Sequence, residues 1–282
     1  MIKVGEYNNL TVVRKPEFGY FLDAQTGDTD DDVLLPTKSA QGKELSIGDE
    51  VEAFIYRDSE DRIISTLKAP LAKVGDIAYL KVASKTNFGH FIDFGLERDI
   101  FVPIKEQNYK IEVGESYLFF IYLDKSSRIA GTTFIDRYLD EAVDYRIGDE
   151  ISGIAYGFQT NGSVLVAVDG KYRAVILKNE YFTPIILGNE LKLRIKKIYE
   201  DGKLGLTPRK AAVIERTELE EVILKYLMKH DGSMTFNDKS SPVEIKETFH
   251  ESKNYFKNAL GGLMRKGLVA QDENGTKLID KN

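Results

Sequence analysis

Two short stretches of the sequence place aromatic residues around a glycine in the same way. Residues 16–23 and 86–93 both contain an aromatic residue, a glycine, any residue, an aromatic residue, an aliphatic residue and an aspartate, in that order. A glycine in a strand lets a flat group approach the backbone, and the rings beside it can stack on that group. Nucleobases stack on aromatic side chains with little regard to base identity. These residues therefore predict base stacking rather than catalysis.

The alternation of side chains along a strand predicts which of these rings face outward. In the second stretch it places Phe91 on one face of the strand and His90 on the other, and in the first stretch it turns Phe21 outward. Phe18 and Phe88 stand at the turn that enters each strand. Each stretch is thus expected to offer two rings to bases. The alternative is that one ring of each pair packs on the core below it.

A second candidate surface is cationic. Lys192, Arg194 and Lys196 alternate with apolar residues, so they are expected to line one face of a strand, and Lys171 and Arg173 are expected to extend that face. A row of cations of this kind can follow the phosphates of a nucleic acid. A solvated protein surface is an equally weighted alternative.

The sequence lacks the residues that most catalytic and metal sites require. There is no cysteine, which excludes disulfides and thiolate metal sites. The three histidines, His90, His230 and His250, are far apart in the sequence, and no carboxylate cluster or nucleophile motif accompanies them. We therefore expect no enzymatic activity, no cofactor and no metal.

The composition is typical of a soluble globular protein, with 42% hydrophobic and 30% charged residues. No apolar run approaches the roughly 18 residues that a membrane helix needs, and the first residues do not resemble a signal peptide. The expected location is the cytoplasm, without a membrane partner. The formal net charge of -6 argues against a uniformly basic surface but leaves room for a local basic patch.

The elements that must position these residues come as a repeat. Three blocks each open with a glycine before an expected strand, and a second glycine follows fourteen residues later. Five short strands in each block predict a small Greek-key barrel of the OB type, which binds oligonucleotides on its second and third strands. The predicted barrels are residues 1–70, 71–145 and 146–210. The shared glycines are Gly5 and Gly19, Gly75 and Gly89, and Gly148 and Gly162.

Residues 211–282 follow a helical pattern instead. Thr217 and Glu220 predict a capping box at the start of a first helix, Ser241 with Pro242 predicts the start of a second, and a third is expected from about Ser252. A hairpin is expected to follow. Three helices and a hairpin are the elements of a winged helix. The residues of the third helix that are candidates for contacts with a partner are Lys253, Asn254, Lys257 and Asn258.

Charge is distributed unevenly over these four predicted domains. From the first to the last, their formal net charges are -6, -3, +4 and -1. The third domain is the only one with a positive balance, so it is expected to supply the electrostatic part of any contact with a nucleic acid. The near-neutral last domain favours contacts with protein at least as much as contacts with duplex nucleic acid.

The motifs resemble a known family. Phe-Gly-x-Phe after a first strand, followed by an aliphatic strand and closed by residues 62–66 (Arg-Ile-Ile-Ser-Thr), resembles the RNA-binding module repeated in ribosomal protein S-one. Three such modules followed by a winged helix resemble the conserved virulence factor B family of Gram-positive bacteria over essentially the whole chain. The third block departs from the pattern, because residues 161–164 replace its aromatic pair. The residues that the resemblance assigns to stacking are Phe18 and Phe21 in the first module and Phe88 and Phe91 in the second.

The sequence thus predicts a mainly β protein with a C-terminal α+β unit, that is, three tandem five-stranded OB-type barrels followed by a winged helix. The leading hypothesis is a non-catalytic protein that binds single-stranded RNA and regulates gene expression after transcription; the resemblance adds a role in virulence. Two alternatives remain. One is a transcription regulator that binds duplex DNA through the winged helix, and the other is a ribosome-associated or scaffold protein.

Overall fold

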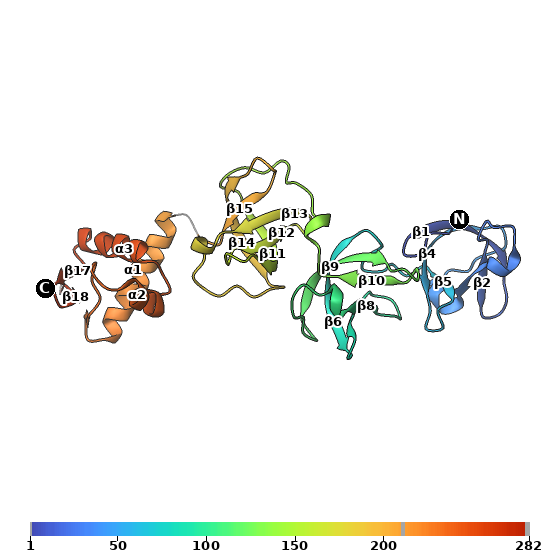
Figure 1. The fold of residues 1–282 in the computed structure, drawn as a ribbon, viewed down its shortest axis with the longest axis horizontal. Coiled ribbons are helices and arrows are strands. Elements are labelled where there is room, and N and C mark those ends of the chain that lie inside the picture. The colour runs from blue at the N-terminus through green and yellow to red at the C-terminus, as the bar shows by residue number, and fades with distance from the viewer. Residues whose placement is uncertain (1, 210–211, 280–282) are drawn as a thin grey trace.

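The computed structural model describes residues 2–209 and 212–279, except for the side chains of residues 212–216. Four domains follow one another in a row, with the N-terminal barrel at one end and the helical domain at the other (Figure 1). The predicted boundary between the third barrel and the last domain, at residues 210 and 211, lies outside the described residues.

Each of the first three domains is a closed barrel of five strands, as predicted. The first strand of each barrel pairs with the second and the fourth, and the third pairs in parallel with the fifth. The first barrel contains β1 (Tyr7–Arg14), β2 (Gly19–Leu22), β3 (Val33–Pro36), β4 (Glu50–Arg57) and β5 (Ile63–Thr66). The second contains β6 (Ile77–Lys85), β7 (Gly89–Ile92), β8 (Ile100–Pro103), β9 (Ser116–Leu123) and β10 (Ile129–Thr132). The third contains β11 (Glu150–Phe158), β12 (Val164–Val168), β13 (Tyr172–Ile176), β14 (Glu190–Ile198) and β15 (Leu204–Thr207).

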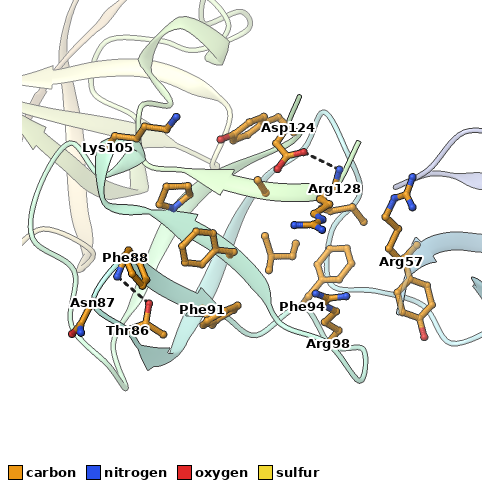
Figure 2. Close-up of a pocket in the computed structure, with 17 residues that line it drawn as sticks. Arg57, Thr86, Asn87, Phe88, Phe91, Phe94, Arg98, Lys105, Asp124 and Arg128 are labelled. Atoms are coloured by element: carbon orange, nitrogen blue, oxygen red, sulfur yellow. Dashed lines mark hydrogen bonds between the residues drawn. The ribbon is translucent and has the colours of Figure 1, made fainter. Parts of the chain in front are cut away.

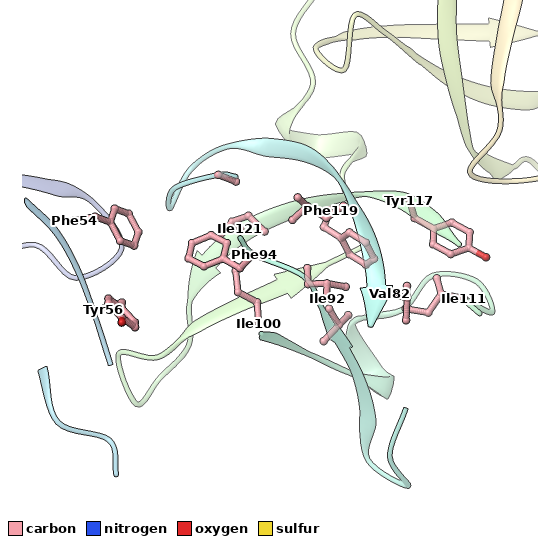
Figure 3. Close-up of a cluster of buried hydrophobic side chains, with 13 residues drawn as sticks. Phe54, Tyr56, Val82, Ile92, Phe94, Ile100, Ile111, Tyr117, Phe119 and Ile121 are labelled. Carbon is pink, nitrogen blue, oxygen red and sulfur yellow. The ribbon is translucent and has the colours of Figure 1, made fainter. Parts of the chain in front are cut away.

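The core of the second barrel continues into the first. Its buried residues include Ile92 and Phe119, which point into the barrel, and the same cluster extends to Phe54 and Tyr56 on β4 of the first barrel (Figure 3). The ring of Phe54 lies 5.8 Å from that of Phe94, and both side chains are buried. The first barrel keeps a separate core of its own, and Phe54 and Tyr56 form the apolar contact that joins it to the second barrel.

The second and third barrels also pack directly on each other. The rings of Phe120 on β9 and Tyr138 in the linking segment stack with their centroids 3.4 Å apart, and the hydroxyl of Tyr79 donates to the carbonyl of Gly188 at 2.8 Å. The linking segment also joins the third barrel through Asp140, whose backbone N–H donates to the carbonyl of Lys171 at 2.8 Å. The buried residues of this interface are Leu118, Ile135, Leu139, Tyr156 and Ala167.

The last domain is a winged helix, as predicted. It contains α1 (Ala212–Lys229), β16 (Ser233–Met234), α2 (Pro242–Phe249), α3 (Lys253–Arg265), β17 (Val269–Asp272) and β18 (Gly275–Leu278). The Ser241 cap is confirmed, because the Ser241 hydroxyl accepts from the N–H of Val243 at 3.2 Å. The capping box at Thr217 is wrong: α1 already begins at Ala212, and the buried carboxylate of Glu220 pairs with Lys266. The short strand β16, which pairs with β18, has no sequence pattern that predicts it.

The two strand glycines have a structural role different from the predicted one. A Cβ atom on Gly89 would lie 2.3 Å from the carbonyl oxygen of Val102 and 2.8 Å from the ring of Phe101, and a Cβ atom on Gly19 would lie 2.4 Å from the carbonyl oxygen of Leu35. The flat group that approaches Gly89 is thus the ring of Phe101 on the neighbouring strand. Gly162 is not their counterpart, because it lies in a turn before β12 with a φ of +78°.

Replacing Gly89 with alanine should destabilise the second barrel by about 2 kcal/mol, because β7 and β8 must separate to accept the methyl group. Hydrogen exchange of the β7 and β8 amides, followed by mass spectrometry, measures this effect. Gly261→Ala is the control, since its added methyl group meets only the end of the Arg265 side chain, at 3.5 Å. Gly261 lies in α3, and alanine has a higher helix propensity than glycine. Unchanged protection of β8 in Gly89→Ala would contradict the steric argument.

Candidate nucleic-acid interface

Three phenylalanine rings lie together on the outer surface of the second barrel. Phe91 on β7 lies opposite Phe101 on β8, with ring centroids 5.1 Å apart and planes tilted by 47°. Phe88 stands at the turn before β7 and is 79% exposed. Its backbone N–H donates to the hydroxyl of Thr86 at 3.2 Å, which holds this turn. The rings at positions 88 and 91 are therefore where the sequence predicts them, and Phe101 adds a third.

These rings form one end of a groove with a volume of about 800 Å³ (Figure 2). Phe88 and Phe91 lie at one end, and Arg98 and Arg128 lie toward the other. Arg57 enters from β4 of the first barrel, so the groove is lined by both barrels. The groove thus combines an aromatic surface, which suits bases, with guanidinium groups, which suit phosphates.

The arginines at this end also connect the two barrels. Arg128 donates two hydrogen bonds, of 2.9 and 3.0 Å, to the carboxylate of Asp61 in the first barrel. The Nε of Arg57 donates to the carbonyl of Ser127 at 3.3 Å in the opposite direction, and Arg98 donates to the carbonyl of Asp58. The guanidinium of Arg128 keeps the pKa of Asp61 below its usual value, so this carboxylate stays charged at neutral pH.

The base of the groove follows one row of residues across four strands. Phe91 lies opposite Phe101, Phe101 pairs with Ala130 on β10, and Ala130 pairs with Tyr122 on β9. The small side chain of Ala130 leaves space between the two aromatic residues on either side of it. Burial, with smaller contributions from Glu106 and Asp124, raises the pKa of Tyr122 to about 12. The hydroxyl of Tyr122 is therefore protonated at neutral pH and can donate a hydrogen bond.

In the first barrel the corresponding aromatic pair is partly covered. Phe18 is 61% exposed, and its ring lies 6.2 Å from that of Phe21 in an edge-to-face arrangement. The guanidinium carbon of Arg14 lies 4.2 Å above the ring of Phe21, and the same group pairs with Asp32 at 2.9 Å. Arg14 thus occupies one face of Phe21, which leaves Phe18 as the accessible ring of this barrel.

The cations of the third barrel alternate along β14 as predicted, because Leu193 and Ile195 between them are buried. Two of them also make contacts within the protein. Lys196 pairs with the buried carboxylate of Glu180 at 2.6 Å, and Arg194 donates to a backbone carbonyl at 3.4 Å. Lys192 is exposed. These contacts limit the number of cations on this face that can reach a phosphate.

Lys171 and Arg173 do not extend this row of cations. Arg173 on β13 comes directly before Ala174, and Ala174 pairs with Leu204, the first residue of β15. Arg194 on β14 pairs with Thr207, the last residue of β15. β15 therefore separates β13 from β14, and the two groups of cations lie toward its opposite ends. Lys171 itself lies 3.8 Å from the carboxylate of Asp140.

In the winged helix, Asn254, Lys257 and Asn258 are exposed on α3, whereas Lys253 is half-buried and donates to the carbonyl of Lys239 at 3.3 Å. The amino end of this helix contacts the third barrel. The guanidinium carbon of Arg209 lies 4.5 Å from the ring of Phe182 and 4.6 Å from the ring of Tyr255 on α3. Arg209 is therefore held between the two domains.

The sequence patterns do not predict several groove residues. Phe101 lies in β8, which the sequence indicates only as an aliphatic strand, although its alignment with the outward-facing Leu34 of the first block is a signal that it faces outward. Arg57, Arg98 and Arg128 lie in or next to turns, and no spacing in the sequence indicates that they meet. Among the described residues, no group of three or more acidic or histidine side chains could hold a metal ion, and no helix is long and apolar enough to cross a membrane.

Comparison with known proteins agrees with this architecture. Residues 4–68 and 74–134 match the family model of the S1 domain, and residues 221–278 match that of the CvfB-like winged helix domain. Uncharacterized protein YitL of Bacillus subtilis (strain 168) is 30% identical over 286 residues, which cover 97% of this chain and 93% of that protein. Conserved virulence factor B of Staphylococcus epidermidis (strain RP62A) is 29% identical over 276 residues, which cover 94% and 91%. This chain belongs to the conserved virulence factor B family.

A solved structure supports the same conclusion. The crystal structure of a multidomain protein with nucleic acid binding domains from Streptococcus pneumoniae TIGR4 is similar to this chain over 98% of each, with a TM-score of 0.54 and 26% sequence identity. The S1 domain model matches the first two barrels, and the similarity to this structure extends over all four domains.

In this member of the virulence factor B family, a buried histidine lies beneath the aromatic surface. His90 on β7 is 6% exposed, so its ring is largely removed from water. Burial, with a smaller effect of the Lys85 charge, lowers the pKa of His90 below its usual value and outweighs the opposing effect of the Gln107 side chain. The folded protein thus favours the neutral imidazole. In the first barrel Tyr20 takes the same position, and its hydroxyl accepts from the N–H of Leu45 at 3.3 Å.

Stability should therefore decrease as the pH falls below about 6.5, where the unfolded chain binds a proton at His90 that the folded barrel disfavours. Thermal unfolding followed by circular dichroism between about pH 5 and pH 8 measures this effect. His90→Tyr should remove that part of the pH dependence, whereas His230→Gln, which changes an exposed histidine, should keep it. Equal pH profiles for wild type and His90→Tyr would show that His90 is not responsible.

Proposed function

We propose that this protein is a non-catalytic regulator of gene expression that binds single-stranded RNA in the groove between its first and second barrels. The observation that carries the proposal is the meeting of three phenylalanine rings with arginines from both barrels in one groove. Bases that are not paired in a duplex can reach such rings, whereas the stacked bases of a duplex cannot. A single strand is therefore the form of nucleic acid that fits this site.

The preference for RNA rests on hydroxyl groups. Stacking does not distinguish RNA from DNA, but the 2′-hydroxyl of ribose does. Tyr122 lines the groove and is half-buried, and burial is the main cause that raises its pKa to about 12. Its side chain is protonated at neutral pH and supplies a hydrogen-bond donor beside the aromatic surface. This donor suits a sugar that carries a 2′-hydroxyl.

Stacking, rather than charge, contributes most of the affinity in this groove. Arg128 is paired with Asp61, and Asp124 lines the same groove, so the positive charge of the groove is partly neutralised. Exposed cations of the third domain, whose net charge is +4, add attraction at longer range. The dependence of binding on salt should therefore be shallow for a short oligonucleotide that occupies only the groove.

Regulation after transcription follows from binding RNA without acting on it, and the cytoplasm is the proposed location. Relatives carry the name conserved virulence factor B, which supports a role connected with virulence. The duplex-DNA alternative is less well supported, because the amino end of α3, the part that contacts bases in helix-turn-helix proteins, is next to Arg209 of the third barrel. We propose that the winged helix makes contacts within the protein or with a protein partner.

Replacing Phe88 or Phe91 with alanine should each weaken binding of a short single-stranded RNA by about 1–3 kcal/mol, the effect expected for one stacked base. Fluorescence anisotropy with labelled single-stranded RNA, single-stranded DNA and duplex DNA measures it. Phe18→Ala should have a smaller effect, because the neighbouring Phe21 is covered by Arg14. Ile147→Ala removes an exposed apolar side chain outside the groove and serves as the control. Unchanged RNA affinity in both groove variants, or tighter binding of duplex DNA, would contradict the proposal.

Arg57→Gln tests whether the first barrel completes the site. The variant should weaken RNA binding and reduce the slope of log affinity against log salt concentration by about one, the change expected for one lost phosphate contact. Arg62→Gln is the matched control, because Arg62 lies in the same hairpin, binds Asp58 with hydrogen bonds of 2.7 and 2.8 Å and does not line the groove. Equal losses in the two variants would indicate general electrostatic attraction instead of a defined contact.

A further inference from the structure

A second hollow lies between the second and third barrels. It has a volume of about 450 Å³ and is lined by both barrels and by the segment that links them. The residues that matter below are Asn108 and Phe134 of the second barrel, Arg137 of the linking segment, and Leu165 of the third barrel. Like the first groove, it lies at a junction where two barrels pack on each other.

The third barrel contributes its own base-binding position to this hollow. In the second barrel the register places Phe91 opposite Ser84, directly after an irregularity in β6; in the third it places Leu165 opposite Gly157, directly after an irregularity in β11. Leu165 is therefore the counterpart of Phe91. It packs beside Ile135 of the linking segment. The surface that binds nucleic acid in an OB-type barrel is thus turned toward the second barrel.

Phe134 supplies the ring that the third barrel lacks. It follows β10, lines the hollow and is 42% exposed. Its backbone N–H donates to the hydroxyl of Thr132 at 3.1 Å, and the next residue, Ile135, is fully buried, so the backbone of Phe134 is fixed on both sides. A half-exposed ring on a fixed backbone is available for stacking with few side-chain torsions to order.

Polar groups that suit a nucleotide stand around this ring. The guanidinium carbon of Arg137 lies 4.7 Å from the ring of Tyr138, which is itself stacked on Phe120. This stacking orients a cation at the edge of the hollow. The backbone N–H of Asn108 donates to the hydroxyl of Thr133 at 2.7 Å, which fixes the backbone of a residue whose amide side chain also lines the hollow. An arginine and an amide are the side chains that most often recognise phosphates and base edges.

The two cavities share one wall. Pro103 and Lys105 line the first groove, whereas Glu106 and Asn108 line the second hollow. These residues belong to one short segment that contains the 3-10 helix Ile104–Glu106. The first groove and the second hollow are therefore separated along this part of the chain by one short segment.

We propose that the hollow between the second and third barrels is a second base-binding subsite for the same single-stranded RNA, with Phe134 as the stacking ring and Arg137 and Asn108 as its polar partners. The inference rests on the proposed function of the first groove. It changes the predicted path of the RNA: stacking continues at the third barrel through a ring supplied by the second, instead of giving way to the cations of β14.

The test uses the full chain and single-stranded RNAs of increasing length, from about 4 to about 16 nucleotides, the range of site sizes known for such barrels. Anisotropy gives the affinity of wild type, Phe134→Ala and Phe134→Trp. The expected result is that Phe134→Ala leaves the shortest RNA unaffected and weakens the longest by about fivefold or more, the effect of one lost base stack. Phe134→Trp should retain the affinity for the long RNA, because its ring can stack equally well.

The matched control is Phe158→Ala. Phe158 is 50% exposed at the end of β11 and does not line the hollow. A loss for the long RNA in Phe158→Ala but not in Phe134→Ala would overturn the proposal in favour of a path along the third barrel itself, and no loss in either variant would also overturn it. A loss for the shortest RNA belongs to the first groove and is tested by Phe88→Ala and Phe91→Ala. Photo-crosslinking of 4-thiouridine RNA to wild type, with adducts expected on the peptide that contains Phe134, is independent of variant folding; their absence would contradict the proposal.

Discussion

The proposed binding surface depends on the apolar contact that fixes the first barrel against the second. Phe54 is fully buried in this contact, and burying a side chain of this size contributes about 1.5–3 kcal/mol. The ion pair between Arg128 and Asp61 is exposed, so water and salt screen it and it stabilises little. Apolar burial therefore holds the barrels together. The hydrogen bonds between the barrels instead orient the guanidinium groups of Arg57 and Arg128. Without this junction, Arg57 would not line the groove of the second barrel.

The sequence was sufficient for the fold because the signals were local. Alternating side chains and regularly spaced glycines predict short strands, and the Ser241 cap predicts the start of α2. The first helix was placed too late because Thr217 and Glu220 match a capping box equally well in the middle of a helix. What distinguishes the two cases is the pairing of Glu220 with Lys266, a contact between residues far apart in the sequence.

The binding surface was only half predictable for the same reason. Phe88 and Phe91 lie next to each other in one motif, so spacing alone placed them together. Phe101 and Tyr122 join them only through the register of β7, β8, β10 and β9, and register between strands is set by the closed barrel rather than by any one segment. The cations of β14 were predicted correctly in position but not in their contacts. Alternation predicts that they share one face, whereas the ion pair of Lys196 depends on Glu180, a residue outside the strand.

Comparison of the three barrels explains why they differ although they share one topology. The equivalent rows are Phe21, Leu34, Ile64 and Tyr56 in the first barrel, Phe91, Phe101, Ala130 and Tyr122 in the second, and Leu165, Val175, Gly205 and Lys197 in the third. Only the row of the second barrel has two neighbouring phenylalanines, followed by a small residue and then a tyrosine. In the first, Ile64 occupies the space that Ala130 leaves open, and Tyr56 is buried against the second barrel. The second barrel therefore carries the aromatic surface, and the first barrel adds Arg57 to the groove beside it.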